Sequence, residues 1–174
     1  MKAYVAGPDV FREDAREHLE EVRELLSRYD ITALIPLDND ETLDFSDRVG
    51  TAAKIYKANL KMIEAADVVL ANIQPFRGDH MDPGTAFEIG YAVALGKPVH
   101  VYTTYAGSRL VERIEGVFKD GCHFDQSGML IEDFDMTENL MITVPASSIS
   151  ETIEDAILSI KREARLRVVP DDEI

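Results

Sequence analysis

Four consecutive apolar residues, Val68-Val69-Leu70-Ala71, stand between the polar residues Asp67 and Asn72. A short β-branched run with polar residues at both ends is typical of a strand buried on both faces. The same character predicts strands at residues 3–6, 31–35 and 99–102, and a fifth strand is expected near residues 140–144.

Helical patterns separate these predicted strands. Apolar residues recur at helical spacing in residues 15–26, 52–66 and 153–164. Ser148 and Glu151, at the spacing of a capping box, precede the last of these helices. Apolar strands that alternate with helices predict a doubly wound, three-layer α/β fold around a parallel sheet, with ligands bound at the carboxyl ends of the strands.

Composition restricts the class of protein. The chain has 174 residues, of which 33 are acidic and 18 basic, giving a formal net charge of −15 that disfavours nucleic-acid and membrane-surface binding. We expect a single domain over residues 1–174. Cys122 is the one cysteine, which suits a reducing compartment, and no apolar run approaches the roughly 18 residues of a membrane span. The first residues end in a Gly7-Pro8 turn rather than a signal-peptide core, so we expect a soluble, cytoplasmic protein.

The segment from Asp82 to Gly96 contains the residue least suited to a core. Between Pro83 and Gly96 the only ionisable side chains are Glu88 and Tyr91. An unpaired carboxylate in a helix that is apolar all round costs several kcal/mol, so Glu88 lies in a cleft or has a partner. Its place in the first turns of the helix favours the ionised form and a role as nucleophile. A structural carboxylate that bridges two elements is an equally good interpretation.

Two further polar residues admit both structural and functional interpretations. Asp82 precedes Pro83 and so predicts a helix N-cap, whereas catalysis would use it as the acid that accompanies a nucleophilic Glu88. Asn59 falls within an apolar stripe, where it either bonds a neighbouring backbone group or orients a catalytic carboxylate.

Motifs for cofactors are missing from the sequence. Neither the dinucleotide fingerprint nor the Walker spacing occurs, and the four histidines have no metal-ligand spacing. We therefore expect no cofactor and no metal.

Several segments, taken together, resemble the nucleoside 2-deoxyribosyltransferase family over most of the chain. They are Tyr4-Val5-Ala6-Gly7-Pro8, Pro36-Leu37-Asp38-Asn39, Ala66-Asp67-Val68-Val69-Leu70-Ala71-Asn72 with Pro75-Phe76-Arg77-Gly78, Asp82-Pro83-Gly84-Thr85-Ala86-Phe87-Glu88-Ile89-Gly90-Tyr91-Ala92, and Asn139-Leu140-Met141. The resemblance implies a flavodoxin-like five-stranded parallel sheet.

The resemblance also implies roles for catalytic residues. Glu88 is the expected nucleophile at C1′ of a 2′-deoxynucleoside, Asp82 the acid–base group and Tyr4 the residue that orients Glu88. The expected reaction is transfer of the 2-deoxyribosyl group between nucleobases by a ping-pong mechanism that retains the β configuration.

Substrate contacts follow from the same resemblance. Asn139 is expected to reach a neighbouring subunit's site in a homo-oligomer, which we expect to be a hexamer. Asn59 replaces an acid of well-known members, and Asp40 stands where some members use a glutamine against the base, which favours adenine or cytosine. The loop after the first strand adds Gly7, Asp9 and Phe11 as substrate-binding residues.

Two other functions remain open at this point. A hydrolase of the same superfamily would cleave 2′-deoxynucleosides or their 5′-monophosphates. Asp9 stands where a phosphate would lie, which argues against a nucleotide substrate. Arg12, a cation in the same loop, leaves the nucleotide alternative open. A non-catalytic nucleotide-sensing module would have no need of the carboxylate pair.

Overall fold

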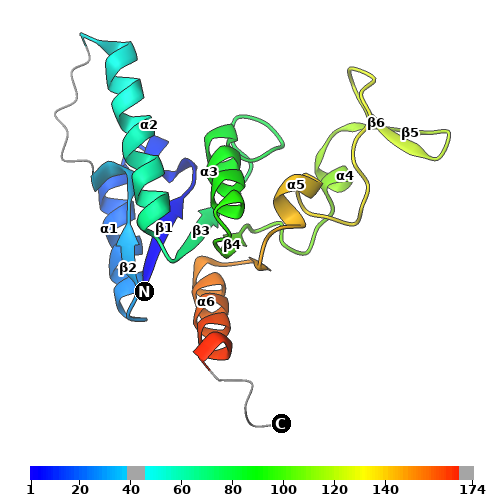
Figure 1. The fold of residues 1–174 in the computed structure, drawn as a ribbon. Helices are drawn as coiled ribbons and strands as arrows, with labels where there is room; N and C mark the ends of the chain where they lie inside the picture. Colours follow the sequence, from blue (N-terminus) through cyan, green and yellow to red (C-terminus); the bar gives the residue numbers. More distant parts are fainter. Residues whose placement is uncertain (39–45, 169–174) are drawn as a thin grey trace, which may run out of the picture.

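The computed structural model describes residues 1–38 and 46–168, and its centre is a sheet of five parallel strands in the order β2-β1-β3-β4-β7 (Figure 1). The strands are β1 (Lys2–Ala6), β2 (Thr32–Leu34), β3 (Val68–Asn72), β4 (Val99–Tyr102) and β7 (Ser148–Ser150). The strand order reverses at β1 and β3, as in flavodoxin-like folds, and this reversal places the ligand-binding crevice beyond their carboxyl ends. The predicted α/β fold is confirmed, and four of its strands lie where the sequence predicts them.

Helices cover both faces of the sheet. They are α1 (Ala15–Ser27) and α6 (Ile153–Val168) on one face, and α2 (Arg48–Ala65) and α3 (Pro83–Ala94) on the other. Alternation along β1 sends Val5 into the first apolar layer and Tyr4 into the second. The side chain of Tyr4 therefore lies on the same side of the sheet as α3.

The fifth strand is not at residues 140–144, so that prediction is wrong. These residues contain the short helix α5 (Leu140–Thr143), whose first turn is capped by Asn139: its side-chain oxygen accepts a hydrogen bond from the Met141 amide at 3.0 Å. An apolar run with β-branched members fits a strand or a helix, and the Asn cap decides between them here.

The predicted capping box before α6 is also wrong. Ser148 belongs to β7, and the cap is Thr152, whose hydroxyl oxygen accepts a hydrogen bond from the Asp155 amide at 3.1 Å. The edge strand β7 therefore occupies the place in sequence that the capping box was expected to take.

An excursion between β4 and β7 projects away from the sheet (Figure 1). It contains α4 (Leu110–Arg113) and the antiparallel hairpin of β5 (Gly116–Lys119) and β6 (Cys122–Asp125). The turn residues Asp120 and Gly121 both have positive φ, 53° and 83°. Asp-Gly is the strongest short-range signal for such a hairpin, and this signal was present in the sequence.

The remaining regular elements are the 3₁₀ helices η1 (Pro8–Phe11) and η2 (Pro36–Asp38), which follow β1 and β2. Within residues 1–38 and 46–168, no helix is both long and apolar enough to cross a lipid bilayer.

Candidate active site

A tyrosine–carboxylate pair joins the sheet to α3. The Tyr4 hydroxyl on β1 donates a hydrogen bond of 2.5 Å to Oε1 of Glu88. Tyr4 is fully buried and Glu88 partly buried. A partly buried carboxylate with a defined donor is what the sequence led us to expect of Glu88, and the structure gives it both a partner and a fixed orientation.

Burial changes the acidity of both groups. The pKa of Glu88 is raised to about 7, mainly by desolvation and in part by the nearby carboxylate of Asp82, while hydrogen bonds from Tyr4 and Asn59 act in the opposite direction. Desolvation, and then the charge and hydrogen bond of Glu88, raise the pKa of Tyr4. Burial thus opposes the ionised form of Glu88 that its position in the helix was expected to favour. A carboxyl group of this kind can exchange its proton near neutral pH.

Asp82 is both the helix cap and a neighbour of Glu88. Its Oδ2 accepts hydrogen bonds from the Thr85 amide at 2.8 Å and from the Thr85 hydroxyl at 2.9 Å. The capping interpretation is thus confirmed. Capping does not exclude a role for Asp82 as the catalytic acid, because Asp82 is close enough to Glu88 to influence the pKa of Glu88.

Asn59 on α2 (Arg48–Ala65) is a further neighbour of Glu88. Its side chain forms the hydrogen bond that lowers the pKa of Glu88, while its own Oδ1 is buried without a hydrogen-bond partner among the described residues. The structure thus favours the interpretation that Asn59 orients Glu88. An amide with an unpaired buried oxygen can accept a further hydrogen bond from a ligand.

The loop after β1 is held against the end of β3. The side-chain amide of Asn72 donates to Oδ2 of Asp9 at 2.8 Å, and Nε2 of His18 lies 3.3 Å from Oδ1 of Asp9. Gly7 has a φ of 152°, and a Cβ atom there would lie 2.7 Å from Cβ of Asn72. The close approach of β1 and β3 at this point therefore requires glycine.

An aromatic cluster lies between the loops after β1 and β3. The rings of Phe11 and Phe76 are stacked with centroids 5.2 Å apart, and the guanidinium carbon of Arg77 lies 4.5 Å from the centroid of Phe76. Phe11 is 58% exposed, so part of its ring remains accessible to another flat group although Phe76 and Arg77 lie against it.

Two predicted substrate residues are not part of this arrangement. The side-chain amide of Asn139 donates to Glu132 at 2.6 Å within the same chain. Its contact with a neighbouring subunit stays a prediction. Asp40 lies outside the described residues.

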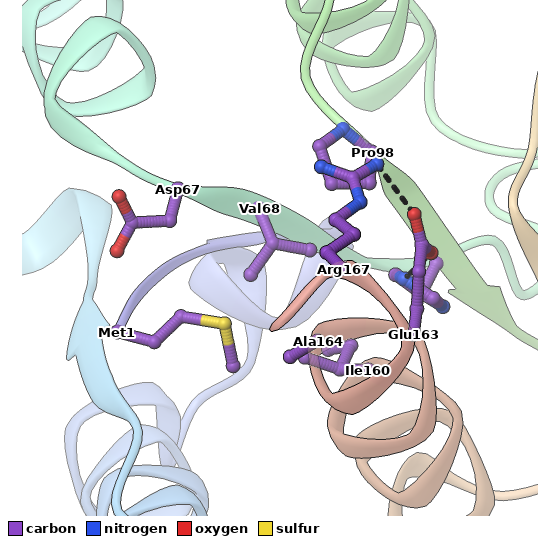
Figure 2. A pocket seen from close by; sticks show the side chains of 9 residues that line it. Met1, Asp67, Val68, Pro98, Ile160, Glu163, Ala164 and Arg167 are labelled. Carbon is purple, nitrogen blue, oxygen red and sulfur yellow. Dashed lines mark hydrogen bonds and ion pairs between the residues drawn. The ribbon is translucent and has the colours of Figure 1, made fainter. Parts of the chain in front are cut away.

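No group of three or more His, Cys, Asp or Glu side chains suited to a metal ion occurs among the residues that the structure describes. A cavity of about 290 Å³ lies at the opposite edge of the sheet, near the amino ends of β3 and β4 (Figure 2). Its lining includes Met1, Asp67, His100, Glu163 and Arg167, and none of the predicted site residues.

Known proteins resemble this chain in sequence and in fold. A family model described as nucleoside 2-deoxyribosyltransferase matches residues 3–141. The chain belongs to this family. An enzyme of the nucleoside 2-deoxyribosyltransferase type is therefore indicated, and the fold agrees with solved structures of such enzymes.

Among solved structures, the 2-desoxiribosyltransferase from Leishmania mexicana is 33% identical, with a TM-score of 0.75 over 92% of this chain and 97% of that one. The 2-deoxyribosyltransferase from Bacillus psychrosaccharolyticus is 23% identical, with a TM-score of 0.60 over 90% of both chains, and shows the shared fold. An uncharacterized protein of Schizosaccharomyces pombe is 35% identical over 103 residues, which are 58% of this chain and 49% of that protein. The chain spans about half the length of this relative.

One polar cluster, formed by Glu138, Arg113 and His80, has no signal in the sequence. The carboxylate of Glu138 lies 3.1 Å from Nη2 of Arg113 and 2.8 Å from Nδ1 of His80. Glu138 directly precedes the predicted site residue Asn139, yet its two side-chain partners are 25 and 58 residues away in sequence. No motif or spacing marked it.

Proposed function

We propose that this protein transfers the 2-deoxyribosyl group between nucleobases, through a covalent intermediate on Glu88. The observation that carries the proposal is the partly buried Glu88 carboxylate, hydrogen-bonded to Tyr4 and close to Asp82. Two carboxyl groups in different environments can serve as nucleophile and acid in cleavage of a glycosidic bond. The Leishmania mexicana relative, itself a 2-desoxiribosyltransferase, supports the same assignment.

The first half of the reaction breaks the bond between C1′ and the base. A carboxylate oxygen of Glu88 forms a bond to C1′, and the electrons of the glycosidic bond pass to the base nitrogen. The departing base receives its proton from Asp82. The carboxylate of Glu88 also stabilises the positive charge that develops at C1′, while Tyr4 and Asn59 keep it oriented.

The second half reverses these steps with another base. A nitrogen of the incoming base attacks C1′, the ester bond to Glu88 breaks, and Asp82 takes the proton that the new base loses. Two displacements at one carbon restore the β configuration.

Binding of the substrate uses residues around this pair. We assign Gly7, Asp9 and Phe11 to the nucleoside, with the exposed face of Phe11 suited to stacking on a base. Asp40 is proposed to select the base, and Asn139 to contact a sugar hydroxyl in a neighbouring subunit. The contact from Asn139 implies a homo-oligomer, which is proposed together with it.

A hydrolase that uses water as the acceptor is the second candidate. A nucleotide substrate would need a phosphate site near β1. Arg12, which follows β1, forms a bidentate ion pair with Asp14: its Nε and Nη2 donate to the two carboxylate oxygens at 2.7 and 2.8 Å. The structure therefore adds no support for a 5′-monophosphate substrate.

The test is a chromatographic assay with 2′-deoxyinosine, with and without adenine or cytosine. We expect 2′-deoxyadenosine or 2′-deoxycytidine to form, and Glu88→Ala to abolish it. Hypoxanthine released at equal rates with and without an acceptor would establish a hydrolase instead. No reaction with either substrate class, nucleoside or 5′-monophosphate, would overturn the proposed function.

A further inference from the structure

The carboxylate of Glu138 is the centre of a buried polar cluster that joins three segments of the chain. Its side chain is 2% exposed. One segment is the loop before α3, which contains His80 and Met81. The second is α4, which contributes Arg113, and the third is the backbone that leads from Glu138 into α5.

Each oxygen of Glu138 has two donors. Oε1 lies 2.8 Å from Nδ1 of His80 and 3.0 Å from the amide nitrogen of Asn139. Oε2 accepts from the Met81 amide at 3.1 Å and from Nη2 of Arg113 at 3.1 Å. An ionised carboxylate has about four acceptor positions, so these four donors match its capacity. A glutamine has one oxygen in place of two, and its NH₂ group would face two of the donors.

Arg113 also binds the backbone on both sides of the Glu138 cluster. Its side chain is 8% exposed, and it donates to the carbonyl oxygen of Asp79 at 3.0 Å and to that of Thr137 at 2.8 Å. Of the three residues directly before Asp82, Asp79 is therefore held by Arg113, and both His80 and Met81 are held by Glu138. One buried ion pair therefore contacts all three residues before Asp82, in addition to the hydrogen bond of 2.9 Å that the Phe76 amide donates to the carbonyl oxygen of His80.

We propose that Glu138 is a positioning residue, which acts through the Met81 amide to fix Asp82 and through its own main chain to fix Asn139. This inference rests on the proposed function of Asp82 as the acid that protonates the departing base. Glu138 does not touch the reacting atoms. Displacement by a fraction of an ångström is sufficient to slow proton transfer, because the acid must be within hydrogen-bond reach of the base nitrogen.

The chemistry of the leaving group separates this role from a general structural one. Hypoxanthine leaves 2′-deoxyinosine with a proton from Asp82, whereas 7-methylguanine leaves 7-methyl-2′-deoxyguanosine from an already cationic ring and needs no proton. A variant in which Asp82 is misplaced is therefore slow with the first substrate and nearly normal with the second. General disturbance of the fold or of Glu88 slows both equally.

The experiment compares Glu138→Gln with Asp82→Asn and with Glu163→Gln as a matched control. Glu163 also pairs with a histidine and an arginine, His100 and Arg167, but at the opposite edge of the sheet (Figure 2). For Glu138→Gln we expect kcat with 2′-deoxyinosine to fall about 10- to 100-fold and kcat with 7-methyl-2′-deoxyguanosine to change less than about threefold. Asp82→Asn should show the same contrast and Glu163→Gln no change. An equal loss with both substrates, or no loss with either, overturns the inference.

Two further measurements cover the cases in which this comparison fails. If Glu138→Gln does not fold, His80→Ala removes one donor to Glu138, and the His80 side chain is 58% exposed. In this variant kcat should fall several-fold with 2′-deoxyinosine and stay nearly unchanged with 7-methyl-2′-deoxyguanosine. If the wild-type protein has no transferase activity, the proposed function is wrong, and amide hydrogen exchange still tests the positioning. Exchange in Glu138→Gln should be at least about tenfold faster in residues 79–85 and 138–142 than in wild type, with no change in Glu163→Gln. Unchanged exchange in these segments overturns the inference.

Discussion

Replacing Glu88 by glutamine is expected to stabilise the protein at alkaline pH. In the folded protein, burial raises the pKa of Glu88 to about 7, from an ordinary value of 4.5. The folded state therefore holds a proton on Glu88 between these two pH values, where the unfolded state has released it. It follows that the contribution of Glu88 to stability is fully present below pH 4.5 and is lost as the pH rises to about 7.

The size of the effect follows from the difference between the two pKa values. One pKa unit corresponds to about 1.4 kcal/mol, so ionising Glu88 in the folded protein costs up to about 3 kcal/mol at pH 8. Glutamine has a similar shape, carries no charge and retains an oxygen that can accept the hydrogen bond from Tyr4. The variant Glu88→Gln should therefore gain up to about 3 kcal/mol relative to wild type at pH 8 and almost nothing at pH 4.

The assay is urea-induced unfolding followed by circular dichroism, at pH 4 and pH 8. Glu64→Gln is a matched control, because Glu64 also accepts a hydrogen bond from a tyrosine, Tyr91, at 2.6 Å but on the exposed surface. This control should stay within about 0.5 kcal/mol of wild type at both pH values. A Glu88→Gln variant less stable than wild type at pH 8, or a difference that does not change with pH, would refute the burial argument.

Three other substitutions test the geometry around this pair. Tyr4→Phe removes a hydrogen bond that lowers the pKa of Glu88, so the acid limb of the kcat/KM profile should move to higher pH in steady-state assays. Gly7→Ala places a Cβ atom 2.7 Å from another one at a φ of 152°, so unfolding experiments should show a loss of about 1–3 kcal/mol, with activity down more than about tenfold. Thr85→Val removes the hydroxyl donor to Asp82 but keeps the amide donor; it should cost about 1 kcal/mol of stability and slow transfer several-fold. A pH profile unchanged in Tyr4→Phe, or stability and activity unchanged in Gly7→Ala or Thr85→Val, would show that the contact in question does not have the role described.

The fold could be predicted because its buried strands have a local signal. Residues 68–71 and 99–102 are apolar runs bounded by polar or turn-forming residues, and both form central strands. The edge strand β7 (Ser148–Ser150) has only three residues and two serines, so hydrophobicity could not find it. The run at 140–144 is more apolar, yet Asn139 directs it into a helix.

The centre of the site could be predicted in part, because it contains polar residues that lie in apolar segments of the sequence. Glu88 in an apolar helix and Asn59 in an apolar stripe are both costly unless paired, and the structure pairs them with each other. Their acidity was not predictable, because the helix position favours ionisation and burial opposes it. The magnitude of burial depends on the packing of Tyr4 and α3, which no local pattern contains.

The cluster around Glu138 shows why positioning residues are harder to recognise than reacting ones. Glu163 on α6 has the same two kinds of partner, with His100 at 2.9 Å and Arg167 at 2.6 Å. In sequence, neither glutamate differs from a surface carboxylate. The difference is topological: the partners of Glu138 include the backbone one residue before Asp82, whereas Glu163 lies at the amino-terminal edge of the sheet. Since ligands of doubly wound sheets bind at the carboxyl ends of the strands, the first cluster is the one that lies next to the proposed chemistry.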